Sequence, residues 1–271
     1  MKVSIQGEAG SFSHEAAGQM VPGAEVLFCA HSAEAFESLA TGRVDAAVIP
    51  IENSLAGSVT EHFDLLLKHD LKIDREMHLR IRHNLIAMPG TKLEQVRQVY
   101  SHPIALAQCR IFFERHGQMK ALPFYDTAGS VKSVMEQGKP EHAAIASASA
   151  ARHYGAEILA ANIEDDPRNF TRFYLIHRAA DAVTAADANK VSLAFALENR
   201  PGSLVEALQA IARLGANLTK IESRPVAGKP WEYIFYVDAQ LQGAGEDQRI
   251  VDAIQPHCSM VKELGLYKEH E

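Results

Sequence analysis

Short apolar runs alternate with helical patterns over the first part of the chain, and no other feature constrains the fold as strongly. Residues 2–5 form a first apolar run, and residues 13–20 follow with a helical pattern for which Ser13 is the expected N-cap. The alternation continues with predicted helices at 32–41, 59–69, 105–115 and 130–137, and with predicted strands at 46–49, 85–88 and 143–146. This rhythm is typical of an α/β domain, in which ligands bind in a cleft at the carboxyl ends of strands.

The pattern changes after an Ala- and Asp-rich stretch, residues 179–189, which we interpret as a linker. Strand, helix, strand, strand, helix and strand patterns then follow at 191–197, 203–214, 218–222, 231–237, 246–254 and 260–266. The order βαββαβ is the ferredoxin-like pattern. The sequence therefore predicts a larger α/β domain at 1–178, a linker at 179–189 and a ferredoxin-like domain at 190–271.

The composition narrows the class of protein. The 271 residues carry a net charge of -7 and no Lys/Arg run, so we expect neither nucleic acid nor a membrane as a partner. The cysteines Cys29, Cys109 and Cys258 are sparse and form no C-x-x-C pair, which indicates free thiols in a reducing compartment. The N-terminus lacks the apolar core of a signal peptide. We therefore expect a cytoplasmic protein.

Polar side chains follow several of the predicted strands. Asn53 and Ser54 lie just beyond one apolar strand, His102 lies beyond another, and Thr127 opens a helix as its possible cap. A glycine-containing loop, residues 7–13, leads into the first helix and can point backbone N–H groups at an anion. Capping and turn formation alone would explain each of these segments. Together they place small hydrogen-bonding groups around one expected cleft.

The stretch Asn169-Phe170-Thr171-Arg172-Phe173 combines a neutral proton donor, a permanent cation and aromatic rings. That combination suits a small, anionic, ring-shaped ligand, although the start of a strand in a polar loop would explain it without chemistry. Neighbouring residues of a regular strand point to opposite faces. Thr171 and Arg172 can therefore reach one ligand only if the backbone is irregular there.

In their order along the chain, these segments resemble the motifs of prephenate dehydratases. The matching stretches are G-x-x-G-S-F-S-H-E-A-A at 7–17, V-I-P-I-E-N-S-L-A-G-S-V at 48–59, S-H-P-x-A-L-x-Q-C at 101–109, D-T-A-G-S at 126–130, A-A-I-A-S at 143–147 and N-F-T-R-F at 169–173. The C-terminal part resembles an ACT regulatory domain, with N-R-P-G-S-L-V at 199–205 and E-S-R-P at 222–225. The resemblance implies a two-lobed catalytic domain like that of a periplasmic binding protein, with the active site between its lobes.

The resemblance also implies a reaction, the decarboxylating dehydration of prephenate to phenylpyruvate in phenylalanine biosynthesis. Thr171 would donate a proton to the leaving hydroxyl, and Arg172 would hold the carboxylate that survives. The side chains expected to orient the substrate are Asn53, Ser54, His102, Thr127, Asn169 and Phe173, although Phe173 suits a core position equally well. Decarboxylation itself supplies the electrons that expel the hydroxyl, so no cofactor is expected. The absence of H-E-x-x-H and of paired Cys/His spacing gives a metal site little support.

The ACT-like motifs imply an effector site for L-phenylalanine. Its expected residues are Asn199, Gly202, Ser203, Leu204, Glu222, Ser223 and Arg224. Gly202 would let the backbone approach the ligand, and the helix that follows would receive its carboxylate. We expect the strand that ends at residues 222–225 to be central in its sheet. ACT-like domains pair side by side, so a homodimer or homotetramer is expected by resemblance.

Three other functions stay open at this point. An arogenate dehydratase performs the same chemistry on the transaminated substrate and shares these motifs. A solute-binding protein would share the two-lobed fold, but an absent signal peptide and an ACT-like domain count against it. A pure amino-acid sensor would leave the stretch 169–173 without a purpose.

Overall fold

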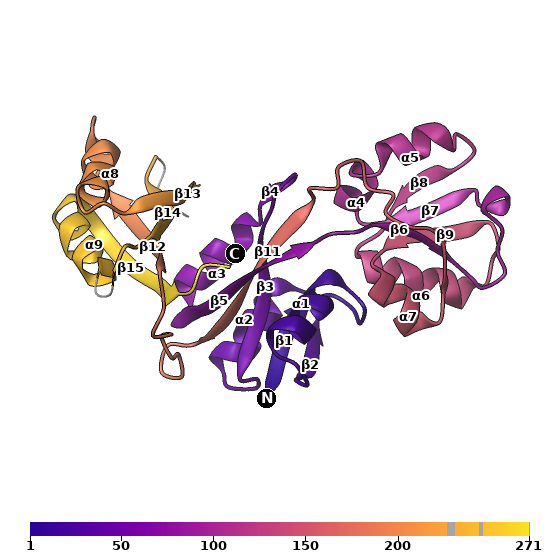
Figure 1. Cartoon of the computed structure of the whole chain (residues 1–271), viewed down its shortest axis with the longest axis horizontal. Helices are drawn as coiled ribbons and strands as arrows, with labels where there is room; N and C mark the ends of the chain where they lie inside the picture. The colour runs from indigo at the N-terminus through magenta and orange to yellow at the C-terminus, as the bar shows by residue number, and fades with distance from the viewer. Residues whose placement is uncertain (227–230, 244–245, 271) are drawn as a thin grey trace. The chain divides into compact units, whose positions relative to one another are not determined.

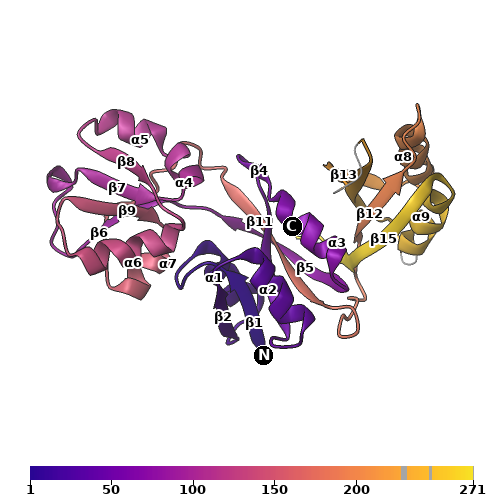
Figure 2. The ribbon, with the colours of Figure 1, turned by 180° about the vertical axis from the view of Figure 1, so that it is seen from behind.

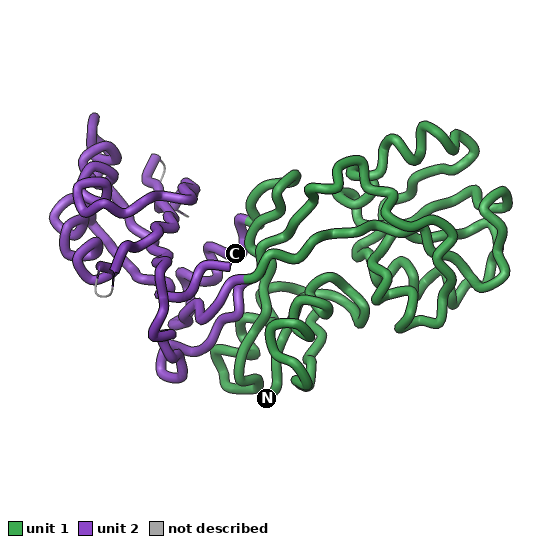
Figure 3. Tube along the Cα trace, viewed as in Figure 1, with its two compact units in different colours: residues 1–59, 77–173 green, residues 60–76, 174–271 purple. Residues whose placement is uncertain are grey.

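The computed structural model describes residues 1–226, 231–243 and 246–270. The described strands form three sheets covered by helices, which confirms the α/β class expected from the sequence (Figure 1). Contacts divide the chain into two compact units that are interleaved along the sequence (Figure 3). Unit 1 comprises residues 1–59 and 77–173, and unit 2 comprises residues 60–76 and 174–271.

The first lobe of unit 1 is built on three parallel strands. They are β1 (Lys2–Gln6), β2 (Glu25–Cys29) and β3 (Ala46–Asn53). The central strand is β1, where Val3 lies opposite Val26 on one side and Ala46 on the other. Val3, Ile5 and Val48 are fully buried, as expected for a parallel sheet covered by helices. The remaining elements of this lobe are α1 (Phe12–Met20), α2 (Ser32–Ala40) and β4 (Gly57–Ser58), with β11 (Phe170–Arg178) and β5 (Leu71–Arg80) completing the sheet order β2-β1-β3-β11-β5.

The second lobe of unit 1, residues 84–160, holds a five-stranded sheet with helices on both faces (Figures 1 and 2). Its strands are β6 (Asn84–Ala87), β7 (Gln98–Ser101), β8 (Lys120–Pro123), β9 (His142–Ala146) and β10 (Glu157–Ala160). Its helices are η1 (Leu93–Gln95), α4 (Pro103–Ala107), α5 (Arg110–Arg115), α6 (Thr127–Gln137) and α7 (Ala148–Tyr154). Leu85 and Ile145 pack with Cys109 on one face, whereas Ile86 and Ala144 pack beneath α6 on the other. Side chains alternate between two covered faces, which explains why these strands are apolar throughout.

Two chain segments join the lobes of unit 1. Residues 81–83 lead out of β5 into the second lobe, and residues 161–169 lead back into β11. The Ile81 N–H donates to the Asn169 carbonyl at 2.8 Å, and the Ile163 N–H donates to the His83 carbonyl at 2.9 Å. The outgoing and returning segments are therefore hydrogen-bonded to each other.

Three local predictions were wrong. The first helix begins at Phe12, and its N-cap is Ser11, whose hydroxyl accepts from the His14 N–H at 3.2 Å. The N-cap of α6 is Asp126 and not Thr127, because the Asp126 carboxylate accepts from the Gly129 N–H at 2.7 Å. A capping side chain has to reach a backbone N–H two or three residues ahead, and in both places the earlier residue does so.

The third wrong prediction is the single helix at 105–115, which the structure divides into α4 and α5. Cys109 leaves the helical conformation at φ -125° and becomes the N-cap of α5. The Asp165 carboxylate accepts from the N–H groups of Arg110 (3.1 Å) and Ile111 (2.9 Å). A distant carboxylate thus satisfies the first donors of a new helix, a contact that local periodicity does not reveal.

Unit 2 contains a four-stranded antiparallel sheet with two helices packed on it. Its strands are β12 (Lys190–Leu197), β13 (Asn217–Pro225), β14 (Tyr233–Gln240) and β15 (Cys258–Tyr267). The two packed helices are α8 (Ser203–Arg213) and α9 (Glu246–Ile254), and the short 3-10 helix η2 (Gln255–His257) follows α9. The strand order is β13-β14-β12-β15. Apolar residues of both helices, among them Ile211 and Ile250, are fully buried against the sheet.

The strand that ends at residues 222–225 is β13, and it lies at an edge of this sheet, so the expectation of a central strand was wrong. In a βαββαβ fold the second strand pairs only with the third, because the first and fourth strands occupy the other positions. An edge strand leaves one row of backbone groups outside the sheet.

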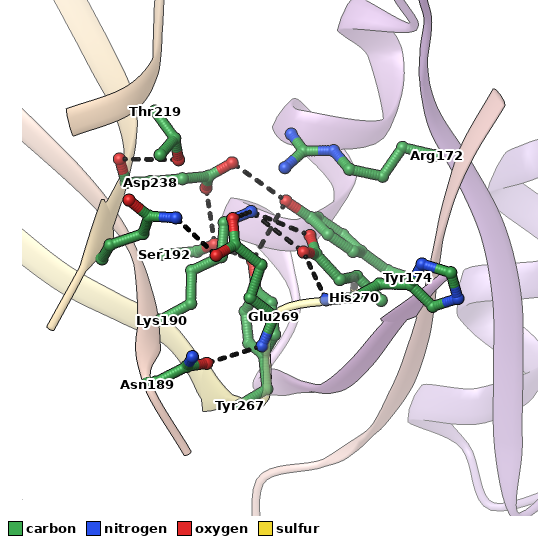
Figure 4. A network of polar contacts seen from close by, with 12 residues as sticks. Arg172, Tyr174, Asn189, Lys190, Ser192, Thr219, Asp238, Tyr267, Glu269 and His270 are labelled. Atoms are coloured by element: carbon green, nitrogen blue, oxygen red, sulfur yellow. Dashed lines mark hydrogen bonds and ion pairs between the residues drawn. The ribbon is translucent and has the colours of Figure 1, made fainter. Parts of the chain in front are cut away.

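Unit 2 also contains α3 (Thr60–Lys68), the beginning of β5 and the end of β11. A buried polar network joins β5 and β11 to the antiparallel sheet (Figure 4). Lys190 Nζ lies 2.9 Å from the buried Glu76 carboxylate and 3.3 Å from that of Glu269. Ser192 Oγ donates to Asp238 Oδ1 at 2.6 Å. A buried charge such as that of Lys190 or Glu76 destabilises the fold strongly if its partner is removed.

We therefore expect Lys190→Ala to lower the free energy of unfolding by about 3–5 kcal/mol, because Glu76 would be left buried without its cation. Denaturant unfolding followed by circular dichroism measures this change. The matched control is Lys2→Ala, which removes an exposed pair with Glu25 and should cost about 1 kcal/mol or less. Equal losses in the two variants would contradict a structural role for the Lys190 pair.

Candidate active site

Asn53 is the last residue of β3, and its side-chain amide reaches the stretch at the start of β11. Its Nδ2 donates to Asn169 Oδ1 at 2.7 Å, to Thr171 Oγ1 at 3.0 Å and to the Phe170 carbonyl at 3.1 Å. The Asn53 amide nitrogen carries two hydrogens but has three acceptors, so two of the acceptors share one hydrogen. The structure thus brings together Asn53, Asn169 and Thr171, which are far apart in the sequence.

The other end of the same amide fixes its orientation. Asn53 Oδ1 accepts from the backbone N–H groups of Leu55 (3.1 Å) and Ala56 (2.9 Å) and from Gln108 Nε2 (3.3 Å). Three donors on one atom identify it as the oxygen, so the amide nitrogen faces Thr171. Since Thr171 Oγ1 accepts from that nitrogen, the hydroxyl proton of Thr171 is left to donate to a ligand.

Gln108 extends this cluster to a histidine. Gln108 Oε1 accepts from Asn169 Nδ2 at 2.9 Å and lies 2.9 Å from His83 Nε2. We did not predict Gln108 or His83 from the sequence. Gln108 lies within the stretch 101–109 that carried part of the resemblance, so the motif could have identified it. His83 lies in no recognised motif and is one of 13 histidines.

Ser54 joins the end of β3 to the start of β11 through hydrogen bonds with backbone groups. Its hydroxyl donates to the Arg168 carbonyl and accepts from the Phe170 N–H, both at 2.9 Å. The Ser54 N–H donates to the Phe170 carbonyl at 2.8 Å. The backbone therefore occupies both hydrogen-bonding roles of this hydroxyl.

Arg172 lies on the opposite face of β11 from Thr171, because the strand is regular from Phe170 to Arg178. Its guanidinium is 3.1 Å from the Glu52 carboxylate, and its side chain is mostly buried. The irregular backbone that would bring Thr171 and Arg172 to one ligand is not observed. Phe173 is only 1% exposed, so its ring belongs to the core in this structure.

His102 and Thr127 lie in a different part of unit 1, where they line a cavity of about 750 Å³. His102 is the N-cap of α4, and Thr127 is the first residue of α6. The cavity is also lined by residues of the loop at 7–13, namely Gly7, Glu8, Ser11, Phe12 and Ser13. Phe12 connects this cavity to the amide cluster, because its ring also packs edge-on against His83 with centroids 5.7 Å apart.

Glycines let the loop at 7–13 approach the second lobe closely. A Cβ on Gly10 would lie 2.5 Å from the Cα of Ala150, and Gly10 has φ +82°. The Gly10 carbonyl accepts from Ser147 Oγ at 2.6 Å, and the same hydroxyl caps α7 by accepting from the Ala150 N–H. The stretches 7–17 and 143–147 therefore meet at a contact between the lobes of unit 1.

The cavity wall carries acidic groups. Glu8 Oε1 accepts from the Tyr125 hydroxyl at 3.3 Å, and Glu8 Oε2 is 3.7 Å from Lys132 Nζ. Burial raises the pKa of the Asp126 carboxyl, and the Glu8 charge raises it further, against the lowering effect of the Gly129 N–H. Among the described residues that line the cavity there is no Lys or Arg.

The residues expected to bind an effector lie in two places of unit 2. Gly202 has φ 88° and is the N-cap of α8, so this turn requires a residue that tolerates the left-handed region. Asn199 is exposed, Ser203 is buried and Leu204 is partly buried around that turn. Glu222, Ser223 and Arg224 alternate along the edge strand β13.

Arg224 makes a contact that the sequence did not predict. Its Nη2 is 2.7 Å from Asp64 Oδ2, and its Nε donates to Asp64 Oδ1 at 3.4 Å. This bond raises the pKa of the Arg224 guanidinium. Asp64 lies on α3, so one of the expected effector residues is bound to a helix outside the antiparallel sheet.

None of the described residues form a group of three or more His, Cys, Asp and Glu side chains that could hold a metal ion. No described helix is long and apolar enough to cross a membrane.

Comparison with known proteins identifies both parts of the chain. The family model of prephenate dehydratase matches residues 3–181, and that of the ACT domain matches residues 191–242. The chain is 37% identical over 98% of its length to arogenate dehydratase/prephenate dehydratase 1 of Arabidopsis thaliana, of which it covers 72%.

Two solved structures are similar over almost the whole chain. The prephenate dehydratase of Arthrobacter aurescens, in complex with L-Phe, is 32% identical with a TM-score of 0.90, over 99% of this chain and 90% of that one. A protein described as GqqA, a novel type of quorum quenching acylase, is 33% identical with a TM-score of 0.91, over 100% of this chain and 98% of that one. The match over most of the sequence, together with the Asn53 and Thr171 cluster, shows that the chain belongs to the prephenate dehydratase family and carries a C-terminal ACT domain.

Proposed function

We propose that this dehydratase converts prephenate to phenylpyruvate and is inhibited by L-phenylalanine. The observation that carries the proposal is the Thr171 hydroxyl, which accepts from Asn53 Nδ2 and so keeps its proton for a ligand. The direct test is to incubate the protein with prephenate and to measure phenylpyruvate. A protein that folds and forms no phenylpyruvate, and no phenylalanine from arogenate, would overturn the proposal.

The reaction requires little chemistry from the protein. The bond between the ring and its carboxylate breaks, carbon dioxide leaves, and the electron pair enters the ring. The carbon–oxygen bond then breaks, the ring becomes aromatic, and the departing oxygen takes a proton to leave as water. Thr171 supplies that proton, or donates a hydrogen bond as charge develops on the oxygen, and recovers it from solvent.

We propose that Arg172 binds a carboxylate of the substrate. A guanidinium fork can hold the carboxylate that survives in phenylpyruvate. In this structure the guanidinium is paired with Glu52 at 3.1 Å. Substrate binding through Arg172 therefore requires that Glu52 share the guanidinium or release it.

For Thr171→Ala we expect kcat to fall on the order of 10²-fold with little change in KM, because the hydroxyl acts mainly in the transition state. Thr171→Ser keeps the hydroxyl and is the matched control, which should retain most of kcat. Steady-state kinetics with prephenate measures both variants. Near-normal turnover in Thr171→Ala would remove Thr171 from the mechanism.

One similar structure is described as an acylase, and the cluster around Thr171 argues against that activity here. Acyl transfer by a hydroxyl or thiol requires a base that activates the nucleophile. Thr171 Oγ1 accepts from the amide nitrogen of Asn53, and this donor cannot take up the hydroxyl proton. Burial raises the pKa of the Cys109 thiol strongly, so this cysteine is a poor nucleophile.

Inhibition by L-phenylalanine is proposed at the turn around Gly202 and at Glu222, Ser223 and Arg224. The similar dehydratase of Arthrobacter aurescens was solved with L-Phe, which supports this ligand class. The Arg224 contact to Asp64 offers a route for coupling, because α3 follows the chain segment that carries Asn53. By family likeness we also propose a cytoplasmic homodimer or homotetramer.

We expect Asp64→Asn to reduce the maximal inhibition by L-phenylalanine several-fold, because the amide cannot hold the Arg224 guanidinium in the same way. Activity without the effector should change little. The matched control is Glu61→Gln, an exposed change on the same helix. Activity measured against L-phenylalanine concentration gives the result, and identical curves for wild type and Asp64→Asn would contradict this coupling route.

Arogenate is the second candidate substrate, and the cavity wall favours it. Curated relatives include the arogenate dehydratases of Petunia hybrida, to one of which the chain is 38% identical. Arogenate carries an ammonium where prephenate carries a ketone. Glu8 and Asp126 line the cavity without a lining Lys or Arg, although Lys132, 3.7 Å from Glu8, partly offsets the charge of Glu8. An ammonium would be stabilised by these carboxylates.

Glu8→Gln should therefore lower kcat/KM for arogenate several-fold relative to kcat/KM for prephenate. Competition between the two substrates, with both products quantified, measures the ratio directly. Glu37→Gln, an exposed change on α2, is the matched control and should leave the ratio unchanged. If the ratio stays the same in Glu8→Gln, the cavity acids do not face the substrate nitrogen.

A further inference from the structure

His83 is a buried residue that the mechanism above does not use. It lies on the segment 81–83, which joins the lobes of unit 1, and it is 2% exposed. Its N–H donates to Glu164 Oε2 at 2.9 Å, and its carbonyl accepts from the Ile163 N–H at 2.9 Å. Both backbone groups are therefore held, and the Phe12 ring packs against the imidazole.

The contacts around Gln108 determine which nitrogen of His83 carries the proton. Gln108 Nε2 donates to Asn53 Oδ1 at 3.3 Å, and Asn169 Nδ2 donates to Gln108 Oε1 at 2.9 Å. The Gln108 atom that faces His83 Nε2 is therefore an oxygen, so Nε2 must be a donor. Burial lowers the pKa of His83, which favours the neutral ring with its single proton on Nε2.

This assignment agrees with the other ring nitrogen. His83 Nδ1 is buried and has no hydrogen-bond partner among the described residues. With the proton on Nε2, the nitrogen without a partner carries only a lone pair. The opposite tautomer would bury an N–H without an acceptor and would set a lone pair against the Gln108 oxygen.

The hydrogen bonds from His83 to Thr171 then all run in one direction. His83 Nε2 donates to Gln108, Gln108 Nε2 donates to Asn53, and Asn53 Nδ2 donates to Thr171. Gln108 and Asn53 each accept through the amide oxygen and donate through the amide nitrogen. Hydrogen bonds linked in this way polarise one another. The series ends at the Thr171 hydroxyl, whose own proton is not used in these hydrogen bonds.

We propose that His83 is a positioning residue for the dehydration step, which fixes the Gln108 amide and, through Gln108 and Asn53, directs the Thr171 proton to the leaving hydroxyl. The inference rests on the proposed function. Without the His83 donor the Gln108 amide can reverse. Its oxygen would then face Asn53 Oδ1, and the Asn53 amide would lose one of the donors that orient it. Thr171 would spend part of its time with its proton turned away from the substrate.

The test compares variants of His83 with and without a hydrogen-bond donor near the position of Nε2. His83→Leu removes the donor, and we expect kcat to fall about tenfold with KM unchanged, the effect of roughly one hydrogen bond. His83→Gln can place an amide N–H near the lost Nε2 and should recover most of kcat. His83→Asn is polar but too short to reach Gln108, so it should resemble His83→Leu, and it keeps the comparison informative if His83→Leu does not fold.

Two further variants separate positioning from stability. His142→Leu removes another buried histidine of the same unit, whose ring packs edge-on against Tyr100, and should leave kcat unchanged at a similar cost in stability. In a Thr171→Ala background, His83→Leu should have no additional effect on kcat, because His83 acts through Thr171.

The possible outcomes are distinct. If wild type forms no product from prephenate or arogenate, the proposed function fails. If wild type is active and both His83→Leu and His83→Asn retain kcat, the positioning role fails while the function stands. Equal loss of kcat in His83→Gln and His83→Asn, or additive loss in the Thr171→Ala background, would also overturn the positioning role.

Discussion

The hydrogen bond from Asn53 Nδ2 to Thr171 Oγ1 is the contact on which the rest of the site depends. It joins the end of β3 to the start of β11, and Ser54 fastens the same two segments through backbone groups. The orientation of one amide decides whether Thr171 donates or accepts toward a ligand. Three donors on Asn53 Oδ1 settle that orientation within the protein, before any substrate is bound.

The lobes of unit 1 are held around this site by two kinds of contact. The segments 81–83 and 161–169 are hydrogen-bonded to each other, and Gly10 lies against the start of α7. Gly10 can do so because it has no Cβ, which would otherwise lie 2.5 Å from Ala150. Within unit 2, the antiparallel sheet is bound to β5 through the buried Lys190 and Glu76 pair and to α3 through the exposed Arg224 and Asp64 pair. Breaking the buried pair would leave a charge without a partner and costs much free energy, whereas water can replace either partner of the exposed pair at little cost.

The sequence predicted the element types well where periodicity was strong. Helix α9 begins and ends where the pattern placed it, and the apolar runs of β6 and β9 became strands covered on both faces. It failed where a distant group decides the local structure. Asp165 starts α5 from more than fifty residues away, so the break at Cys109 leaves no local signal. Likewise, the edge position of β13 follows from the pairing of four strands and not from its own residues.

For the site, the sequence by itself determined the residue types and, through ordered motifs, the family: Asn53, Asn169 and Thr171 were identified before their contacts were known. Only the tertiary structure decided their roles. It joined these three residues to Gln108 and His83, it set His102 and Thr127 in a separate cavity wall, and it placed Phe173 in the core. The physical reason is that a hydrogen bond has direction and short range. Motifs list the donors and acceptors, but the direction in which each group donates depends on all of its neighbours, and folding brings those neighbours from distant parts of the chain.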